Sequence, residues 1–104
     1  MLYELRIYGI AEGKMAKIIQ FMRDTNRRFF KKHGFGIEGM WLPDDENSKW
    51  YYLLSFQDKA DREKKWADFY AEPDWIAEQK ALGLEDTVVS VESYLMKQAP
   101  FFQK

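Results

Sequence analysis

The chain has 104 residues, no cysteine and a formal net charge of −1 at pH 7, from 16 Lys and Arg against 17 Asp and Glu. This length predicts a single domain, residues 1–104, and leaves no room for a second core of ordinary size. With charges this balanced, the protein has no extended positive electrostatic potential that would attract nucleic acid, membrane lipid or an acidic substrate. We therefore expect neither nucleic acid nor membrane as a partner. The absence of cysteine excludes disulfides, a thiolate nucleophile and sulfur-based zinc or iron–sulfur sites, and it fits a reducing compartment.

The first third of the chain changes from the period of a strand to the period of a helix. Residues 2–8 alternate apolar or aromatic side chains with Glu, Arg and Tyr, as a strand does. From Met15 onward, apolar residues recur at intervals of three and four, and Thr25 and Asn26 interrupt this stripe without breaking it. Gly34 can adopt positive φ after a helix, so we predict that the helix ends just before it.

A hairpin and a second helix are predicted next. Residues 36–42 and 49–56 have the composition of strands, and turn-forming residues fill the connection 43–48. Asp58 precedes a run of good helix formers and can cap their first turn. Pro73 then stops or kinks this second helix.

The last third is predicted to hold a short helix and a strand. Proline is tolerated in a first helical turn, so the residues from Pro73 onward can open another helix that ends before Gly83. Residues 87–96 are rich in β-branched side chains and indicate a strand. Residues 98–104 form a C-terminal tail.

This order of elements predicts an α+β, ferredoxin-like βαββαβ fold with an antiparallel four-stranded sheet. Right-handed crossovers place the first strand beside the third and fourth, with the helices on one face. The third strand carries large apolar or aromatic side chains on both faces. At about 25 cal/mol per Å² of apolar surface, leaving several aromatic rings in water would forfeit several kcal/mol. We therefore expect a homodimer in which two sheets pack face to face.

Several short segments together resemble the NIPSNAP family over nearly the full length. They are Tyr3-Glu4-Leu5-Arg6-Ile7-Tyr8, Gly13-Lys14, His33-Gly34-Phe35, Gly39 with Trp41, and Pro73-Asp74-Trp75. The resemblance implies a dimeric α/β barrel, in which two ferredoxin-like chains join their sheets. It implies no reaction, because short members have no assigned one. The sequence does not show the N-terminal targeting extension of mitochondrial members, so we expect a cytoplasmic location.

Relatives in the wider superfamily include cofactor-independent oxygenases, haem-degrading enzymes and isomerases, so the fold does not select a chemistry. In such relatives the ligand commonly lies between the sheet and its helices. We expect aromatic walls for such a pocket here, with Trp41 and Trp66 able to stack on a planar ligand and Tyr94 able to donate a hydrogen bond. Tyr8 belongs to the same aromatic set.

His33, the only histidine, falls on the apolar stripe of the first helix. One interpretation makes it a catalytic general base, or an axial ligand if haem binds, because imidazole titrates near neutral pH. The other places it in the last helical turn, where it interacts with the helix dipole and caps the C-terminus.

Glu4 and Arg6 share one face of the first strand, and we expect Glu92 on the last strand to reach the same face. If this cluster is buried, its charges must be paired, which favours a structural network that fixes dimer register. The alternative is that the forked guanidinium of Arg6 binds an anionic substrate.

Other chemistries lack their motifs. The sequence has no Gly-rich phosphate loop, no His pair at helical spacing and no Asp-rich calcium loop, so we expect no metal and no cofactor. The basic residues at 27–32 and 62–65 have acidic residues nearby in the sequence, which indicates a solvated helix face rather than a nucleic-acid site. These acids are Asp24, Asp61, Glu63 and Asp68.

Two functions remain open. The first is binding of a small apolar or aromatic molecule between sheet and helices, in a cofactor-independent oxygenase or isomerase if the protein is an enzyme. The alternative is a non-catalytic homodimeric interaction module, which engages another protein through its helices and the loop 43–48.

Overall fold

Four antiparallel strands form one sheet in the computed structural model, which describes residues 1–45 and 48–102. They are β1 (Leu2–Ile10), β2 (Gly36–Trp41), β3 (Lys49–Phe56) and β4 (Val88–Met96), in the spatial order β2-β3-β1-β4. β1 therefore lies between β3 and β4, which confirms the ferredoxin-like arrangement. Part of the predicted turn 43–48, at positions 46–47, lies outside the described residues.

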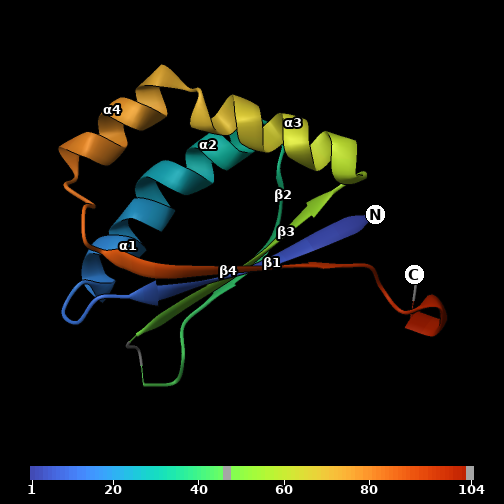
Figure 1. The fold of residues 1–104 in the computed structure, drawn as a ribbon, viewed down its shortest axis with the longest axis horizontal. Helices are drawn as coiled ribbons and strands as arrows, with labels where there is room; N and C mark the ends of the chain where they lie inside the picture. The colour runs from blue at the N-terminus through green and yellow to red at the C-terminus, as the bar shows by residue number, and fades with distance from the viewer. Residues whose placement is uncertain (46–47, 103–104) are drawn as a thin grey trace.

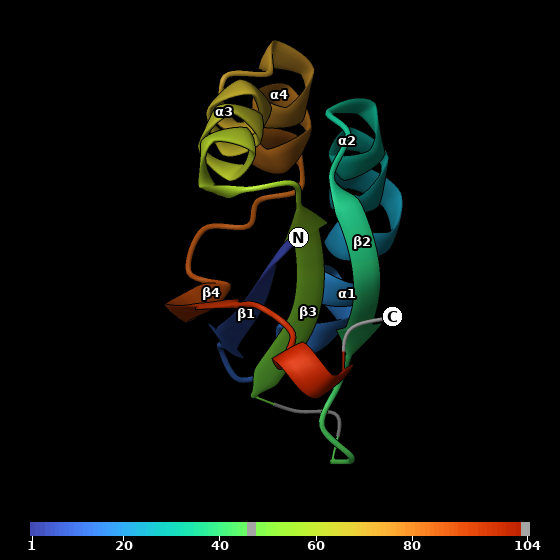
Figure 2. The same ribbon diagram turned by 90° about the vertical axis from the view of Figure 1, so that its right-hand side faces the viewer.

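The helices α1 to α4 cover one face of this sheet (Figure 1). A single rod from Met15 to Lys32 consists of α1 (Met15–Phe21), the π-helical segment η1 (Met22–Asn26) and α2 (Arg27–Lys32). Beside it lies the pair α3 (Lys59–Tyr70) and α4 (Pro73–Ala81), as Figure 2 shows. A short 3₁₀ helix, η2 (Pro100–Phe102), follows the sheet.

The ends of the helices follow the predicted signals. The Asp58 carboxylate accepts a hydrogen bond from the Asp61 N–H at 2.8 Å and so caps α3. Pro73 occupies the first turn of α4, where its missing N–H costs nothing. Gly34, at φ +78°, ends the rod directly after His33.

The core lies between the sheet and the helices. Tyr52, Leu54 and Phe56 of β3 point toward the helices and are almost completely buried. Phe30 of α2 lies near the middle of this layer, with its ring centroid 4.9 Å from those of Phe35 and Phe69. No helix in residues 1–45 and 48–102 is long and apolar enough to cross a membrane.

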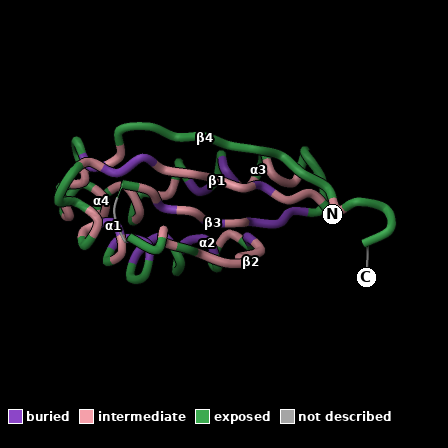
Figure 3. The backbone as a smooth tube through the Cα atoms, turned by 90° about the horizontal axis from the view of Figure 1, so that it is seen from below, coloured by how far each residue is buried: buried purple, intermediate pink, exposed green. Residues whose placement is uncertain are grey.

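The opposite face of the sheet, which we call the outer face, carries apolar side chains that no described helix covers. The strand register places Leu5 opposite Leu53 and Tyr94, and Tyr51 opposite Trp41. Further members of this face are Tyr3, Ile7 and Met96. Seen from below in Figure 3, β3 and β1 are partly buried while β4 is exposed along most of its length.

Gly39 and Trp41 form one unit on the outer face. A Cβ atom at position 39 would lie 2.4 Å from Cη2 of the Trp41 indole, much closer than carbon atoms approach each other. The indole therefore lies over the bare backbone of Gly39. This packing gives a physical reason for the glycine and tryptophan spacing seen in the sequence.

Candidate functional site

A cavity of about 240 Å³ lies between the sheet and the helices. Its walls come from β1, the rod α1-η1, the pair α3-α4 and the segment that enters β4. The lining side chains are Arg6, Tyr8, Ile18, Phe21, Asn26, Trp66, Phe69, Tyr70, Trp75, Gln79, Leu84, Val88 and Val91. Most are aromatic or aliphatic, and a few are polar, as in small-molecule pockets generally.

A buried carboxylate lies beside this cavity. Glu4 is completely inaccessible to solvent and accepts hydrogen bonds from Nε and Nη2 of Arg62 at 2.8 and 3.0 Å. Trp66 Nε1 and Ser93 Oγ donate to it at 2.9 and 2.6 Å, and Arg6 Nη1 at 3.1 Å. Burial alone would raise the pKa of Glu4, but these hydrogen bonds and the charge of Arg6 lower the pKa to about 2. Glu4 is therefore a carboxylate at neutral pH.

Arg6 brings a positive charge to the cavity wall. Its side chain is only 12% exposed, and its Nε donates a hydrogen bond of 2.7 Å to the Tyr52 hydroxyl. The guanidinium carbon lies 4.5 Å from the centroid of the Trp66 ring. This distance is within the range of a cation–π interaction, which partly replaces the lost hydration of the guanidinium.

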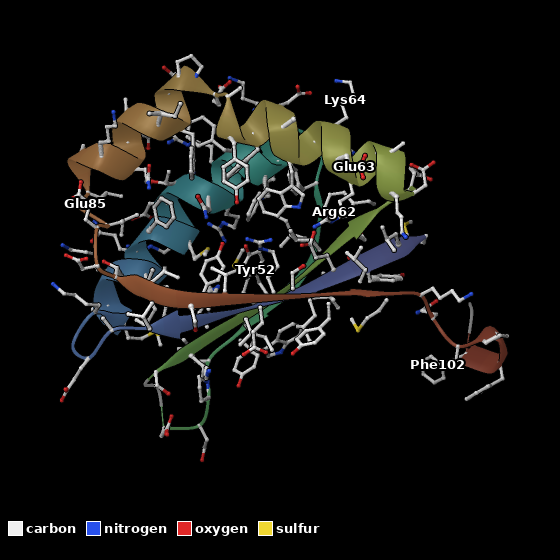
Figure 4. All side chains as sticks on the ribbon, viewed as in Figure 1. Tyr52, Arg62, Glu63, Lys64, Glu85 and Phe102 are labelled. Atoms are coloured by element: carbon white, nitrogen blue, oxygen red, sulfur yellow. The ribbon has the colours of Figure 1, made fainter. Side chains whose placement is uncertain are left out.

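A pair of tyrosines continues from Arg6. The hydroxyl oxygens of Tyr8 and Tyr52 are 2.7 Å apart, and their rings meet edge to face. Tyr52 is completely buried, and this burial raises its pKa well above the ordinary value. Figure 4 shows Tyr52 of β3 and Arg62 of α3 in the layer between sheet and helices. The Tyr52 phenol is therefore a neutral hydrogen-bonding group at neutral pH.

The π-helical segment η1 supplies a further polar wall. Thr25 and Asn26, which interrupt the apolar stripe in the sequence, are buried within it. The wider π turn re-aims side chains relative to an α-helix, and such turns recur at functional sites. Asn26 Oδ1 accepts a hydrogen bond of 2.7 Å from Trp75 Nε1, which fixes the indole of α4 against the cavity.

The structure brings together some of the site residues predicted from the sequence and separates others. Arg6, Tyr8 and Trp66 line the same cavity. Trp41 and Tyr94 do not, because the strand register directs both to the outer face, where each is 50% exposed. As walls of a pocket between sheet and helices, these two assignments are corrected.

The predicted cluster of Glu4, Arg6 and Glu92 is wrong in its third member. Glu92 lies opposite Ile7 and therefore on the outer face, where its carboxylate accepts a hydrogen bond from Tyr94. Ser93, opposite Arg6, contacts Glu4 instead. A shift of one residue along a strand moves a side chain to the other face, so the choice of Ser93 over Glu92 requires the register between β4 and β1.

Sequence reasoning also missed Arg62, Tyr52 and Tyr70. Arg62 lies 58 positions after Glu4, so its bidentate pairing with Glu4 has no local signal in the sequence. Tyr52 was assigned to the third strand without a polar role, yet its position opposite Arg6 in the antiparallel pair could have suggested one. Tyr70 stacks on Trp66 with ring centroids 5.3 Å apart.

His33 lies away from this cavity. It follows α2 directly, and its Nε2 is 3.6 Å from an oxygen of Glu72, the residue that precedes α4. Its ring centroid is 6.5 Å from that of Phe69. This contact joins the end of α2 to the start of α4. The general-base or haem-ligand role of His33 stays a prediction, and His33 does not line the cavity.

The basic residues at 27–32 and 62–65 are largely paired with acids. Arg28 contacts Glu78 and Lys32 contacts Glu72, both across the helical layer. Lys64 and Lys65 pair with Asp68 and Asp61 on their own helix at N–O distances of 2.8 and 3.1 Å. This pairing is consistent with the solvated face expected from the sequence.

The chain belongs to the NIPSNAP family, because the family model matches residues 3–103. The sequence resemblance is thereby confirmed. No curated protein matches the chain.

Solved structures show the same fold. A NIPSNAP family protein of unknown function from Agrobacterium tumefaciens has a TM-score of 0.85 at 22% identity, over 97% of this chain and 90% of that one. An uncharacterized NIPSNAP domain protein from Burkholderia xenovorans has a TM-score of 0.84 at 21% identity, over 100% of both chains. A more distant likeness is to an antibiotic biosynthesis monooxygenase, with a TM-score of 0.69 at 11% identity, over 96% of this chain and 100% of that one. Identities this low establish the fold and no activity.

Proposed function

We propose that this protein binds a small apolar or aromatic molecule in the cavity between the sheet and the helices. The observation that supports the proposal is the cavity itself, in which aromatic and aliphatic walls surround a few polar groups. An apolar cavity of about 150 Å³ is enough for benzene. A cavity of about 240 Å³ therefore has room for one aromatic ring and a short substituent.

A cofactor-independent oxygenase or isomerase reaction is the catalytic form of this proposal. The oxygenase reaction is supported by the likeness of the fold to an antibiotic biosynthesis monooxygenase. Arg6 and Tyr8 are the polar groups that would contact a reacting molecule in the cavity, since both line it.

A ligand screen tests binding. Small quinols, short fatty acids and aromatic acids are added one at a time, and the melting temperature and tryptophan fluorescence are recorded. A ligand at about 100 times its Kd stabilises the fold by about 2.7 kcal/mol, which raises the melting temperature by on the order of 10 °C. Trp66 and Trp75 line the cavity, so their emission should change as well.

A matched pair of variants locates the response. Val88→Phe adds a ring to a side chain that lines the cavity, and it should abolish the shift. Val89→Phe makes the same change on the next side chain, which is 67% exposed, and the shift should remain. If no compound changes the melting temperature of the native protein, or if Val88→Phe responds like Val89→Phe, binding in this cavity is disproved.

We also propose that the protein is a homodimer through its outer face, the arrangement that a non-catalytic interaction module would share. The supporting observation is the set of apolar side chains on this face, of which Trp41 and Tyr94 are half exposed and Met96 is 39% exposed. Large exposed apolar patches of this kind mark protein interfaces. Capture of a specific protein partner, with no ligand response in the screen, would favour the module over the ligand-binding function.

A further inference from the structure

The cavity carries a single charged side chain, and that charge is positive. Of the lining residues, all of them in the described part of the chain, Arg6 is the only one that is charged. A guanidinium stays protonated throughout the accessible pH range. A ligand that enters this cavity therefore meets a desolvated cation and no carboxylate in the wall.

The nearby carboxylate does not neutralise this cation fully. Glu4 forms two parallel hydrogen bonds with Arg62, whereas Arg6 makes a single and longer one, of 3.1 Å, to an oxygen that Arg62 and Ser93 also contact. Two guanidinium groups thus share one carboxylate, and the cluster keeps a formal charge of +1. A buried charge is costly unless it is paired, so an anion at Arg6 would be favourable.

The tyrosine pair directs a second donor toward the same place. Arg6 Nε can only donate, so the Tyr52 oxygen accepts this hydrogen bond. Within residues 1–45 and 48–102, the Tyr8 oxygen is then the acceptor available to the Tyr52 proton, and leaving that proton unpaired would cost about 1–3 kcal/mol. The chain of donation therefore runs from Arg6 through Tyr52 to Tyr8. The Tyr8 proton is left over, and Tyr8 lines the cavity.

We infer that the ligand of this cavity is a small aromatic carboxylate, bound through its carboxylate by Arg6 and the Tyr8 hydroxyl. This inference rests on the proposed function and names the class of ligand. Both donors line the cavity, and Phe21, Leu84 and Trp75 provide apolar surface for the ring. Arg6 Nε already donates to Tyr52 and Nη1 to Glu4, so Nη2 is the nitrogen that would donate to one carboxylate oxygen of the ligand, and the Tyr8 hydroxyl would donate to the other.

Pairs of aromatic acids and their amides test the inference. The probes are benzoate with benzamide, phenylacetate with phenylacetamide, and cinnamate with cinnamamide, titrated at pH 7 by calorimetry. Each pair has nearly the same shape and differs in charge. Hydrogen bonds to a charged group are worth about 1.5–3 kcal/mol, so at least one acid should bind roughly 10- to 100-fold more tightly than its amide.

Variants identify the groups responsible. Arg6→Met should remove the preference for the acid while amide binding persists. Tyr8→Phe keeps the ring and should weaken acid binding roughly 3- to 10-fold, as expected for loss of one hydrogen bond. Tyr3→Phe is the matched control, because Tyr3 lies on the outer face of the same strand, and it should bind the acids like the native protein.

The outcomes separate the two proposals. If neither acids nor amides bind, the proposed ligand-binding function fails together with this inference. If amides bind as tightly as acids, or if Tyr8→Phe keeps the full preference, the cavity binds ligands but the carboxylate assignment is wrong. If Arg6→Met does not fold, acid binding by Tyr8→Phe is compared with acid binding by the control Tyr3→Phe. Equal affinities for the acid would then disprove the carboxylate assignment.

Discussion

Glu4 is the residue on which the polar layer of this protein depends most directly. Glu4→Gln would leave Arg6, which is 12% exposed, and the partly exposed Arg62 without their shared countercharge, and removing one partner of a buried ion pair costs about 3–5 kcal/mol. We expect the free energy of unfolding, measured by urea denaturation at pH 7, to fall by an amount in this range. Glu63→Gln, an exposed change on α3, should alter it by less than about 0.5 kcal/mol. Equal stabilities of the two variants would contradict the role given to Glu4.

The same carboxylate predicts a specific dependence of stability on pH. The pKa of Glu4 is lowered in the folded protein from 4.5 to about 2, so the folded state binds this proton less readily than the unfolded chain does. The stabilisation of the folded state by ionised Glu4 is complete above about pH 4.5 and is lost as the pH falls toward 2. The slope contributed by one group is at most about 1.4 kcal/mol per pH unit. In Glu4→Gln this component should be missing between pH 5 and pH 2, and an unchanged profile in that variant would disprove the assignment.

At the scale of single elements, the start of α3 offers a direct test of helix capping. Asp58→Ala removes the acceptor for the Asp61 N–H and should lower the free energy of unfolding by about 1 kcal/mol. Asp58→Asn keeps an acceptor of the same length and should cost only a few tenths of that amount. Thermal and urea denaturation of the two variants distinguish the cap from a general effect of the lost charge. Equal losses in both would assign the effect to charge.

Elements with a strong period were predictable, and their relative placement was less so. Alternation located β1 and composition located β3, and the interruption at Thr25 and Asn26 coincides with η1, although nothing in it specified a π turn. β4 has apolar and polar residues on both faces, so its sequence could not tell Ser93 from Glu92 as the neighbour of Glu4. That choice depends on register, which only the pairing with β1 sets.

The candidate site was predictable in its β1 part, and in its helical part only for Trp66. Arg6 and Tyr8 could be placed because strand alternation puts them on one face with Glu4. Trp66 is predicted as an aromatic wall able to stack on a planar ligand, and it lines the cavity. Arg62 comes from a contact between distant segments of the chain, and such contacts have no local pattern.

At the scale of the whole molecule, the sheet has one covered face and one open face. Helices cover the inner face (Figure 1). The cavity and the buried polar layer lie on this side of the sheet. The outer face carries aromatic and aliphatic side chains, and β4 is exposed along almost its whole length. Packing such a face against a second apolar face removes apolar surface from water, and this burial stabilises the pair relative to two separate hydrated faces. The cavity and the proposed dimer contact therefore use opposite sides of β1.

The outer face yields the prediction that tests the homodimer. Leu53 lies on β3 opposite Leu5, near the middle of that face, and Leu53→Arg would place a charge in the proposed interface. We expect the native protein to sediment at twice 12.5 kDa at micromolar concentration and Leu53→Arg to sediment at 12.5 kDa. Ala67→Arg, on the exposed side of α3, should remain dimeric because it adds the same charge away from the interface. A native protein that sediments at 12.5 kDa would disprove the dimer and leave the cavity, which one chain forms by itself, as the basis of function.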